Sequence, residues 1–247
     1  MTTRRWTITS DKFLSSEQVA VLLDHLCRER DLALARGNNP QAVRDFYLLR
    51  GLLETGLRVS EFCSLVNSDF SGLKLVVRHG KGDKPRTVLL TRSTAELFKE
   101  WLAVKGSLGF STDPSAPMFP SRYRKHYSVR GVQKRVKLIF SALEFPALLS
   151  VHSLRHTYCS LLIASGKVGI GTVRDNMGHH SITITDLYTH AVGSIENVEL
   201  FERPSSPILE KDELETSTAT ARSKGLVKER LRRMRKANFQ DRVPKTR

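Results

Sequence analysis

Residues 73–90 read LKLVVRHGKGDKPRTVLL and hold the clearest strand signal in the chain. Two runs rich in β-forming residues flank a turn that is rich in Gly, Asp and Pro. This pattern predicts an antiparallel hairpin over about residues 73–90. The other patterned segments mostly have helical spacing. We therefore expect a mainly α-helical domain that carries a small antiparallel β-sheet, which is an α+β fold.

Helix signals lie on both sides of the hairpin. Ser15 and Gln18 form a capping box at the start of a first helix. Asn39 followed by Pro40 opens a second helix, which ends at Gly56. Further helices are expected over residues 59–66, from Ser93 onward, over a basic stretch from 121 to about 143, and over about 152–165.

The charge balance points to a polyanionic partner. The 247 residues include 40 Lys and Arg against 25 Asp and Glu, which gives a net charge of +15. Nucleic acid is the first candidate and an anionic membrane surface the second. No apolar run approaches the roughly 20 residues of a membrane span, and the first residues lack a signal-peptide core. The cysteines have neither paired nor metal-type spacing and are expected to be reduced core residues: Cys27, Cys63 and Cys159.

Four separated motifs carry residues suited to phosphodiester chemistry: TGLRVSEF (55–62), HGKGDKPR (79–86), HSLRHT (152–157) and MGHHSITITDLYTH (177–190). The planar fork of arginine binds two phosphate oxygens at once. Tyrosine can attack phosphorus, but only about one phenol in a thousand is ionised at pH 7, so it needs help. Histidine and lysine can supply and accept the protons.

In these motifs, and in their order and rough spacing, the chain resembles the tyrosine recombinase family, also called the phage integrase family, which includes Xer-type recombinases. The resemblance covers about residues 12–201. It implies the catalytic-domain fold of that family. It also implies site-specific DNA recombination through a 3′-phosphotyrosyl intermediate, in the integration, excision or resolution of a mobile element or replicon. No cofactor is implied.

The resemblance also implies roles for single residues. Tyr188 would be the nucleophile, and the other catalytic candidates are Arg58, Lys81, His152, Arg155 and His179. Among these, Arg58, Arg155 and His179 resemble the phosphate-binding residues, His152 the proton-handling histidine, and Lys81 the lysine that protonates the leaving 5′ oxygen. Two alternatives stay open: Lys84 could donate that proton instead, and Arg58 could simply form a surface ion pair with Glu61.

A metal site is a further alternative for the histidines. His152 and His156 stand four residues apart, and His179 with His180 could complete a ligand set. The HSLRH segment, however, lacks the glutamate of the HExxH pattern, and Arg155 would repel a divalent cation. We therefore expect no metal, and we expect His156 and His180 to have structural roles.

The run SRYRKHYSVRGVQKRVK (121–137) is strongly basic. We expect a helix that faces DNA and contacts phosphates, although a solvated charged face is the alternative. The candidate DNA-binding residues are Arg122, Arg124, Lys125, Arg130, Lys134 and Arg135.

The composition divides the chain into an N-terminal extension (1–11), a catalytic domain (12–203), a polar linker (204–221) and a basic C-terminal tail (222–247). The tail is either a solvated segment or a basic helix that lies on DNA or a partner. Relatives usually carry a core-binding domain before the catalytic domain, and it is not expected here. The chain is then either a minimal family member or part of a longer one.

The expected partners are double-stranded DNA with a specific recombination site, three further copies in a homotetramer on two such sites, and an accessory DNA-binding protein. A cytoplasmic, nucleoid-associated location is expected, without a membrane. Two other functions remain in view. One is a catalytically silent DNA-binding regulator, and the other is a type IB topoisomerase activity.

Overall fold

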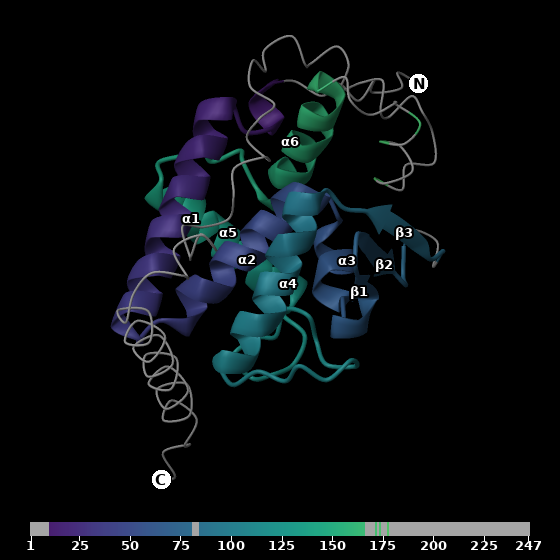
Figure 1. Cartoon of the computed structure of the whole chain (residues 1–247). Coiled ribbons are helices and arrows are strands. Elements are labelled where there is room, and N and C mark those ends of the chain that lie inside the picture. Colours follow the sequence, from purple (N-terminus) through teal and green to yellow (C-terminus); the bar gives the residue numbers. More distant parts are fainter. Residues whose placement is uncertain (1–9, 81–83, 166–170, 172, 174–176, 178–247) are drawn as a thin grey trace, which may run out of the picture.

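The computed structural model describes residues 10–80, 84–165, 171, 173 and 177. Helices dominate, and three short strands interrupt them (Figure 1). The α+β class is thereby confirmed. In chain order the elements are η1 (Ser10–Lys12), α1 (Ser16–Arg36), α2 (Pro40–Thr55), α3 (Val59–Ser64), η2 (Asn67–Asp69), β1 (Phe70–Ser71), β2 (Lys74–Val77), β3 (Arg86–Leu89), α4 (Arg92–Ser107), α5 (Val129–Ala142) and α6 (Val151–Ala164).

The predicted hairpin is confirmed. Strands β2 and β3 pair antiparallel, with Leu75 opposite Val88, and the Leu90 N–H donates to the carbonyl of Leu73 at 2.9 Å. The core face of the hairpin carries the buried side chains of Leu75, Val77 and Val88. Strand β1 adds a third, antiparallel strand on the other side of β2. The sequence did not predict β1, because two residues are too few to show an alternating pattern.

Helix α2 is the centre of the domain. It lies against α1, α4 and α6, and α1, α2 and α4 run side by side in Figure 1. The predicted start is confirmed, since the Asn39 side chain accepts from the Ala42 N–H at 3.1 Å and Pro40 is the first helical residue. Gly56 ends the helix in the left-handed conformation at φ 60°.

Helix α1 starts as predicted and is tied to α6. The Ser15 hydroxyl accepts from the Gln18 N–H at 3.2 Å, and the Gln18 side chain accepts from the Ser15 N–H at 2.9 Å. Leu14, just before this cap, is buried and donates its backbone N–H to the Thr157 hydroxyl at 2.9 Å. The entry to α1 is therefore held against the helix that carries the HSLRHT motif.

A buried lysine holds the loop after α4. Lys105 has no solvent exposure, and its ammonium donates to the Asn67 side chain at 2.7 Å and to the carbonyls of Pro117 and Met118 at 2.7 and 3.1 Å. Burial lowers the pKa of Lys105 to about 8. The Trp101 indole donates to the same Met118 carbonyl at 2.8 Å. The loop is thereby fixed without regular structure.

The expectation of a helix from residue 121 is wrong. Helix α5 begins at Val129, after a cap in which the Ser128 hydroxyl accepts from the Gly131 N–H at 3.1 Å. Before it, the Ser121 N–H donates to the carbonyl of Lys125 at 2.8 Å, and Arg124 has φ 63°. A left-handed residue cannot continue an α-helix, so residues 121–127 form a turn.

The cysteines are free thiols, with Cys63 and Cys159 buried as expected and Cys27 half-buried. In the part of the chain that the structure describes, no helix is both long and apolar enough to cross a bilayer.

Candidate active site

Arg155 lies on α6, in the HSLRHT motif, and points at the end of α2. Its side chain is nearly buried, with 8% exposure. Nη1 donates to the carbonyl of Gly56 at 2.5 Å, and Nη2 donates to the carbonyl of Met177 at 2.6 Å. The guanidinium therefore joins two backbone segments that are distant in the sequence.

Gly56 allows α6 to approach α2 this closely. A Cβ atom at this position would lie 2.1 Å from Cδ1 of Tyr158, and the positive φ already disfavours other residues. The next residue but one is Arg58. Since each residue spans at most about 3.6 Å of chain, the Arg58 Cα lies within about 7 Å of the Gly56 Cα. The fold thus brings the segments of Arg58 and Arg155 together, as the motifs predict.

Arg58 is fixed at the start of α3 by a carboxylate one turn ahead. Its backbone N–H donates to Glu61 Oε2, and its Nη1 donates to Glu61 Oε1, each at 2.9 Å. The Arg58 side chain keeps 28% exposure, whereas that of Glu61 keeps 3%. The ion pair of the alternative is therefore present, but it is not a surface pair, because the carboxylate is buried.

Glu61 is also bound by Arg86, the first residue of β3. Nη1 of Arg86 donates to Oε1 at 2.8 Å and Nη2 donates to Oε2 at 2.9 Å, so the pair is two-pronged. Burial by itself would raise the pKa of Glu61, but the hydrogen bonds and charges of Arg86 and Arg58 outweigh it and lower the pKa to about 2. Glu61 is ionised at neutral pH.

Sequence reasoning did not single out Arg86. The available signal was its register, because Arg86 precedes the buried Val88 by two residues and so lies on the core face of its strand. A cation on that face requires a buried anion nearby. Identifying Glu61 as that anion requires the fold, because the two residues lie 25 positions apart.

The two histidines of HSLRHT differ in environment. His152 is exposed in the first turn of α6, three positions before Arg155 and hence on the same side of the helix. His156 is partly buried, and burial together with the charges of Arg155, His152 and Lys12 lowers its pKa to about 4. His156 is neutral at pH 7, which fits the structural role expected for it.

Four of the named candidates, Lys81, His179, His180 and Tyr188, lie outside the described residues. Gly80 directly precedes Lys81, and a Cβ atom on Gly80 would lie 2.5 Å from the Lys84 carbonyl oxygen and 3.2 Å from Nη1 of Arg86. The chain leading into the hairpin turn therefore passes beside the Glu61 and Arg86 pair. Lys84, the alternative proton donor, is exposed.

The candidate DNA-binding residues fall into two groups. Exposed side chains are those of Arg122, Arg124 and Lys125 in the turn, and of Arg130 and Lys134 on α5. Arg135 differs, because its Nε donates at 2.5 Å to the buried carboxylate of Asp45 on α2.

The basic turn is anchored at both ends. Nη1 of Arg44 donates to the Pro120 carbonyl at 3.2 Å, and Nδ1 of His126 lies 2.8 Å from the Cys63 carbonyl oxygen. The guanidinium of Arg44 also lies over the ring of Tyr127, 4.6 Å from its centroid. The exposed cations of the turn thus sit on a backbone held by both α2 and α3.

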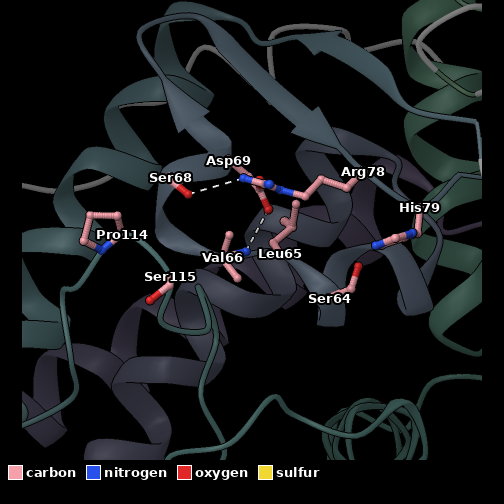
Figure 2. A pocket seen from close by; sticks show the side chains of 9 residues that line it. All are labelled: Ser64, Leu65, Val66, Ser68, Asp69, Arg78, His79, Pro114 and Ser115. Atoms are coloured by element: carbon pink, nitrogen blue, oxygen red, sulfur yellow. Dashed lines mark hydrogen bonds and ion pairs between the residues drawn. The ribbon is translucent and has the colours of Figure 1, made fainter.

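A cavity of about 420 Å³ opens beside the sheet, between the end of α3, η2 and the loop at Pro114 and Ser115 (Figure 2). Its polar wall is the ion pair of Arg78 with Asp69, at 2.5 Å between Nε and Oδ1. The other Asp69 oxygen accepts from the Val66 N–H at 2.8 Å. None of the described catalytic candidates, Arg58, His152 and Arg155, lines this cavity.

Comparisons with known proteins identify the family of the chain. The model of the phage integrase family matches residues 12–193. The tyrosine recombinase XerD of Brucella melitensis is 34% identical over 184 residues, which cover 73% of this chain and 59% of that protein. The tyrosine recombinase XerC of Caldanaerobacter subterraneus is 36% identical over 155 residues, or 62% of this chain and 43% of that protein. The chain thus spans about half the length of these relatives.

Solved structures are similar in fold. XerA recombinase has a TM-score of 0.57 at 24% identity, with 77% of this chain and 62% of that one covered. The catalytic domain of bacteriophage HP1 integrase has a TM-score of 0.51 at 24% identity, with 74% and 89% covered. The recombinase catalytic-domain fold is therefore confirmed, and with the family match over most of its length the chain belongs to the phage integrase family.

Proposed function

We propose that this chain is a tyrosine-type site-specific recombinase that cuts and rejoins double-stranded DNA through a 3′-phosphotyrosyl link at Tyr188. The observation that carries the proposal is the bond from Arg155 to the carbonyl of Gly56, since it joins the HSLRHT motif to the TGLRVSEF motif. We infer that the two arginines, from separate motifs, act on one phosphate.

The proposed chemistry needs no energy source beyond the DNA itself. Arg58 and Arg155 bind the nonbridging oxygens and stabilise the charge that develops on them. The phenol oxygen of Tyr188 bonds to phosphorus, the bond to the 5′ oxygen breaks, and Lys81 protonates that oxygen. His152 accepts the proton that the Tyr188 phenol loses in this attack, and His179 adds a contact to the phosphate. Attack by a 5′ hydroxyl on the phosphotyrosine reverses these steps and reseals the strand.

Known relatives and the charge of the chain support DNA as the partner. XerH recombinase, 25% identical, was solved with its difH substrate before cleavage. The net charge of +15 and the exposed cations near α5 suit a phosphate backbone. We extend the proposal to a homotetramer on two DNA sites, an accessory DNA-binding protein, and action in the cytoplasm at the nucleoid.

The test is covalent trapping. Duplexes that the wild-type chain retains are enriched from a random-sequence pool. Each duplex is then nicked near the centre, so that the short fragment with the free 5′ hydroxyl diffuses away after attack. We expect a protein–DNA species that survives denaturant with the wild-type chain. Tyr188→Phe should bind the same duplexes and give no such species, because the attacking oxygen is gone.

Tyr127→Phe is the matched control, since it also removes one phenolic hydroxyl group and keeps the ring that packs on Arg44. It should trap DNA as the wild type does. Retention of DNA with no wild-type adduct would contradict recombination and favour a silent DNA-binding regulator. Relaxation of supercoils without recombinant products would favour a type IB topoisomerase activity.

A further inference from the structure

We propose that Arg86 is a positioning residue for strand cleavage, which acts through Glu61 to hold Arg58 in its phosphate-binding orientation. This inference rests on the proposed function and assigns a role to a residue outside the six catalytic candidates of the resemblance. The role is indirect, because Arg86 donates to both oxygens of Glu61, and Glu61 in turn binds Arg58.

The hydrogen bonds of Glu61 carry the argument. Oε1 accepts from Nη1 of Arg58 and Nη1 of Arg86, at 2.9 and 2.8 Å. Oε2 accepts from the backbone N–H of Arg58 and Nη2 of Arg86, each at 2.9 Å. A carboxylate has about four acceptor positions, so these four bonds use its full capacity. Its plane cannot turn without breaking a bond to Arg58 or to Arg86.

Arg86 joins two elements through the carboxylate of Glu61. Arg58 and Glu61 belong to the start of α3, whereas Arg86 belongs to β3. Its side chain keeps 15% exposure, and Nη1 would touch a Cβ atom on Gly80 at 3.2 Å. The two bonds to Glu61 and the nearby backbone of Gly80 restrict the guanidinium.

Charge explains why a neutral or single-pronged substitute should fail. Glu61 is almost fully buried, and burial alone disfavours its ionised form. Without Arg86, one cation and two of the four hydrogen bonds remain to keep it ionised. A protonated Glu61 would hold Arg58 less firmly, because one of its oxygens would then carry a proton.

The experiment uses the trapping duplex described above with the full chain. Arg86→Gln should lower the single-turnover cleavage rate about 10- to 100-fold while DNA retention stays close to wild type, as expected for a displaced catalytic group. The cleavage rate of Arg86→Lys should lie between those of wild type and Arg86→Gln, because an ammonium group keeps the charge but cannot form the two-pronged pair.

Arg78→Gln is the matched control for lost stability. Arg78 follows β2, and its Nε donates at 2.5 Å to Asp69, a carboxylate as buried as Glu61. Among the described residues, Arg78 bonds to Asp69 and Ser68 and to neither Arg58 nor Glu61, so its loss should lower the melting temperature and leave cleavage close to wild type. If Arg78→Gln and Arg86→Gln lose cleavage equally, the role of Arg86 is only structural and the inference fails.

Two readouts separate positioning from mere folding. Loss of Arg86 should raise the pKa of Glu61. The cleavage rate of Arg86→Gln should therefore fall further below pH 7, in a range where Glu61 of the wild type stays ionised. The double variant Glu61→Gln with Arg86→Gln should cleave no more slowly than Glu61→Gln alone, because both changes remove one linkage. Additive losses would overturn the inference.

A sulfur-bridged substrate shows which catalytic group is displaced. When sulfur replaces the leaving 5′ oxygen, the leaving group departs as a thiolate. It needs no proton from the protein, since a thiol ionises far more readily than an alcohol. The Arg86→Gln defect should persist on this duplex, because Arg58 is the displaced group. Full recovery would place the defect at the proton donor and overturn the inference.

The result for the wild-type chain distinguishes a failure of the proposed function from a failure of the role of Arg86. An absent wild-type adduct contradicts the proposed function itself. A normal wild-type adduct together with wild-type cleavage by Arg86→Gln contradicts only the role of Arg86.

Discussion

The guanidinium of Arg155 donates to the carbonyl oxygen of Gly56 at 2.5 Å, across 99 positions of sequence. Gly56 ends α2 in the left-handed conformation, and it packs so close to Tyr158 that a Cβ atom would not fit. Arg58 follows two residues later, as the residue that precedes α3. This hydrogen bond therefore links the two arginine-bearing motifs directly.

Replacing either arginine should abolish most cleavage. We expect Arg155→Lys and Arg58→Lys each to lower the single-turnover rate about 100- to 1,000-fold, by analogy with loss of one oxyanion donor. Arg155→Lys should also lower the free energy of unfolding, because the carbonyls of Gly56 and Met177 lose a nearly buried partner, at a cost of roughly 1–3 kcal/mol for each unsatisfied group. Urea unfolding measures this second effect. A fully active Arg155→Lys would contradict the assignment.

Gly56→Ala should destabilise the domain more than Gly72→Ala. Both glycines have left-handed backbone, with φ 60° and 57°, so each substitution costs about 1–2 kcal/mol from conformation alone. At Gly72 the new methyl group meets nothing within 4 Å, whereas at Gly56 it meets the ring of Tyr158. Overpacking should add about 1–3 kcal/mol.

Urea unfolding of both alanine variants gives the comparison. Equal losses of unfolding free energy would show that α6 does not press on Gly56 as the structure has it. The same variants test whether cleavage depends on this packing, since only Gly56→Ala disturbs the contact of Arg155.

Glu61→Gln should change how stability depends on acid. The folded pKa of Glu61 is about 2, below its ordinary value of 4.5, so its ionisation stabilises the fold above pH 4.5. That contribution, about 3 kcal/mol from the size of the shift, is lost as the pH falls from 4.5 toward 2. The difference in unfolding free energy between wild type and Glu61→Gln should therefore shrink over this range.

Glu54 supplies the control of opposite sign. Burial raises its pKa although Arg50 pairs with it at 2.5 Å. A raised pKa in the folded state means that this state binds the proton more tightly than the unfolded state. Acid should therefore stabilise the wild type relative to Glu54→Gln. Parallel curves for the two variants would contradict both assignments.

The basic residues of α5 should separate into a binding group and a structural one. Arg130→Ala and Lys134→Ala should weaken DNA binding at all sequences and each reduce the slope of log affinity against log salt by about 1. Arg135→Ala should instead lower the unfolding free energy by roughly 1–3 kcal/mol, since it leaves the buried Asp45 without this partner. Filter binding at several salt concentrations and urea unfolding measure the two effects. A salt slope unaffected by Arg130→Ala would contradict its phosphate contact.

Local signals explain what the sequence could predict. The capping box of Ser15 and Gln18, the Asn39 cap and the antiparallel pairing of the hairpin strands each depend on residues close in sequence, and each is confirmed. The start of α5 was mispredicted because the left-handed Arg124 and the Ser128 cap interrupt a run whose composition is basic throughout. Composition alone does not show a backbone reversal.

Tertiary contacts explain what the sequence could not predict. The motifs identify Arg58 and Arg155, but the anion that holds Arg58 is buried by elements from elsewhere in the chain. Its second partner, Arg86, lies on a strand 25 positions away from Glu61. The pattern of residues shows which side chains suit the chemistry, whereas their orientation depends on packing between helix and sheet.

The fully occupied carboxylate of Glu61 has a consequence for the timing of entropy loss. A freely rotating arginine gives up as much as about 2 kcal/mol of rotamer entropy when it is immobilised. Arg58 is immobilised when the chain folds, because Glu61 already holds both its backbone and its side chain. An arriving anion therefore meets a cation that is ordered beforehand, and the free energy of that encounter is not reduced by ordering the side chain.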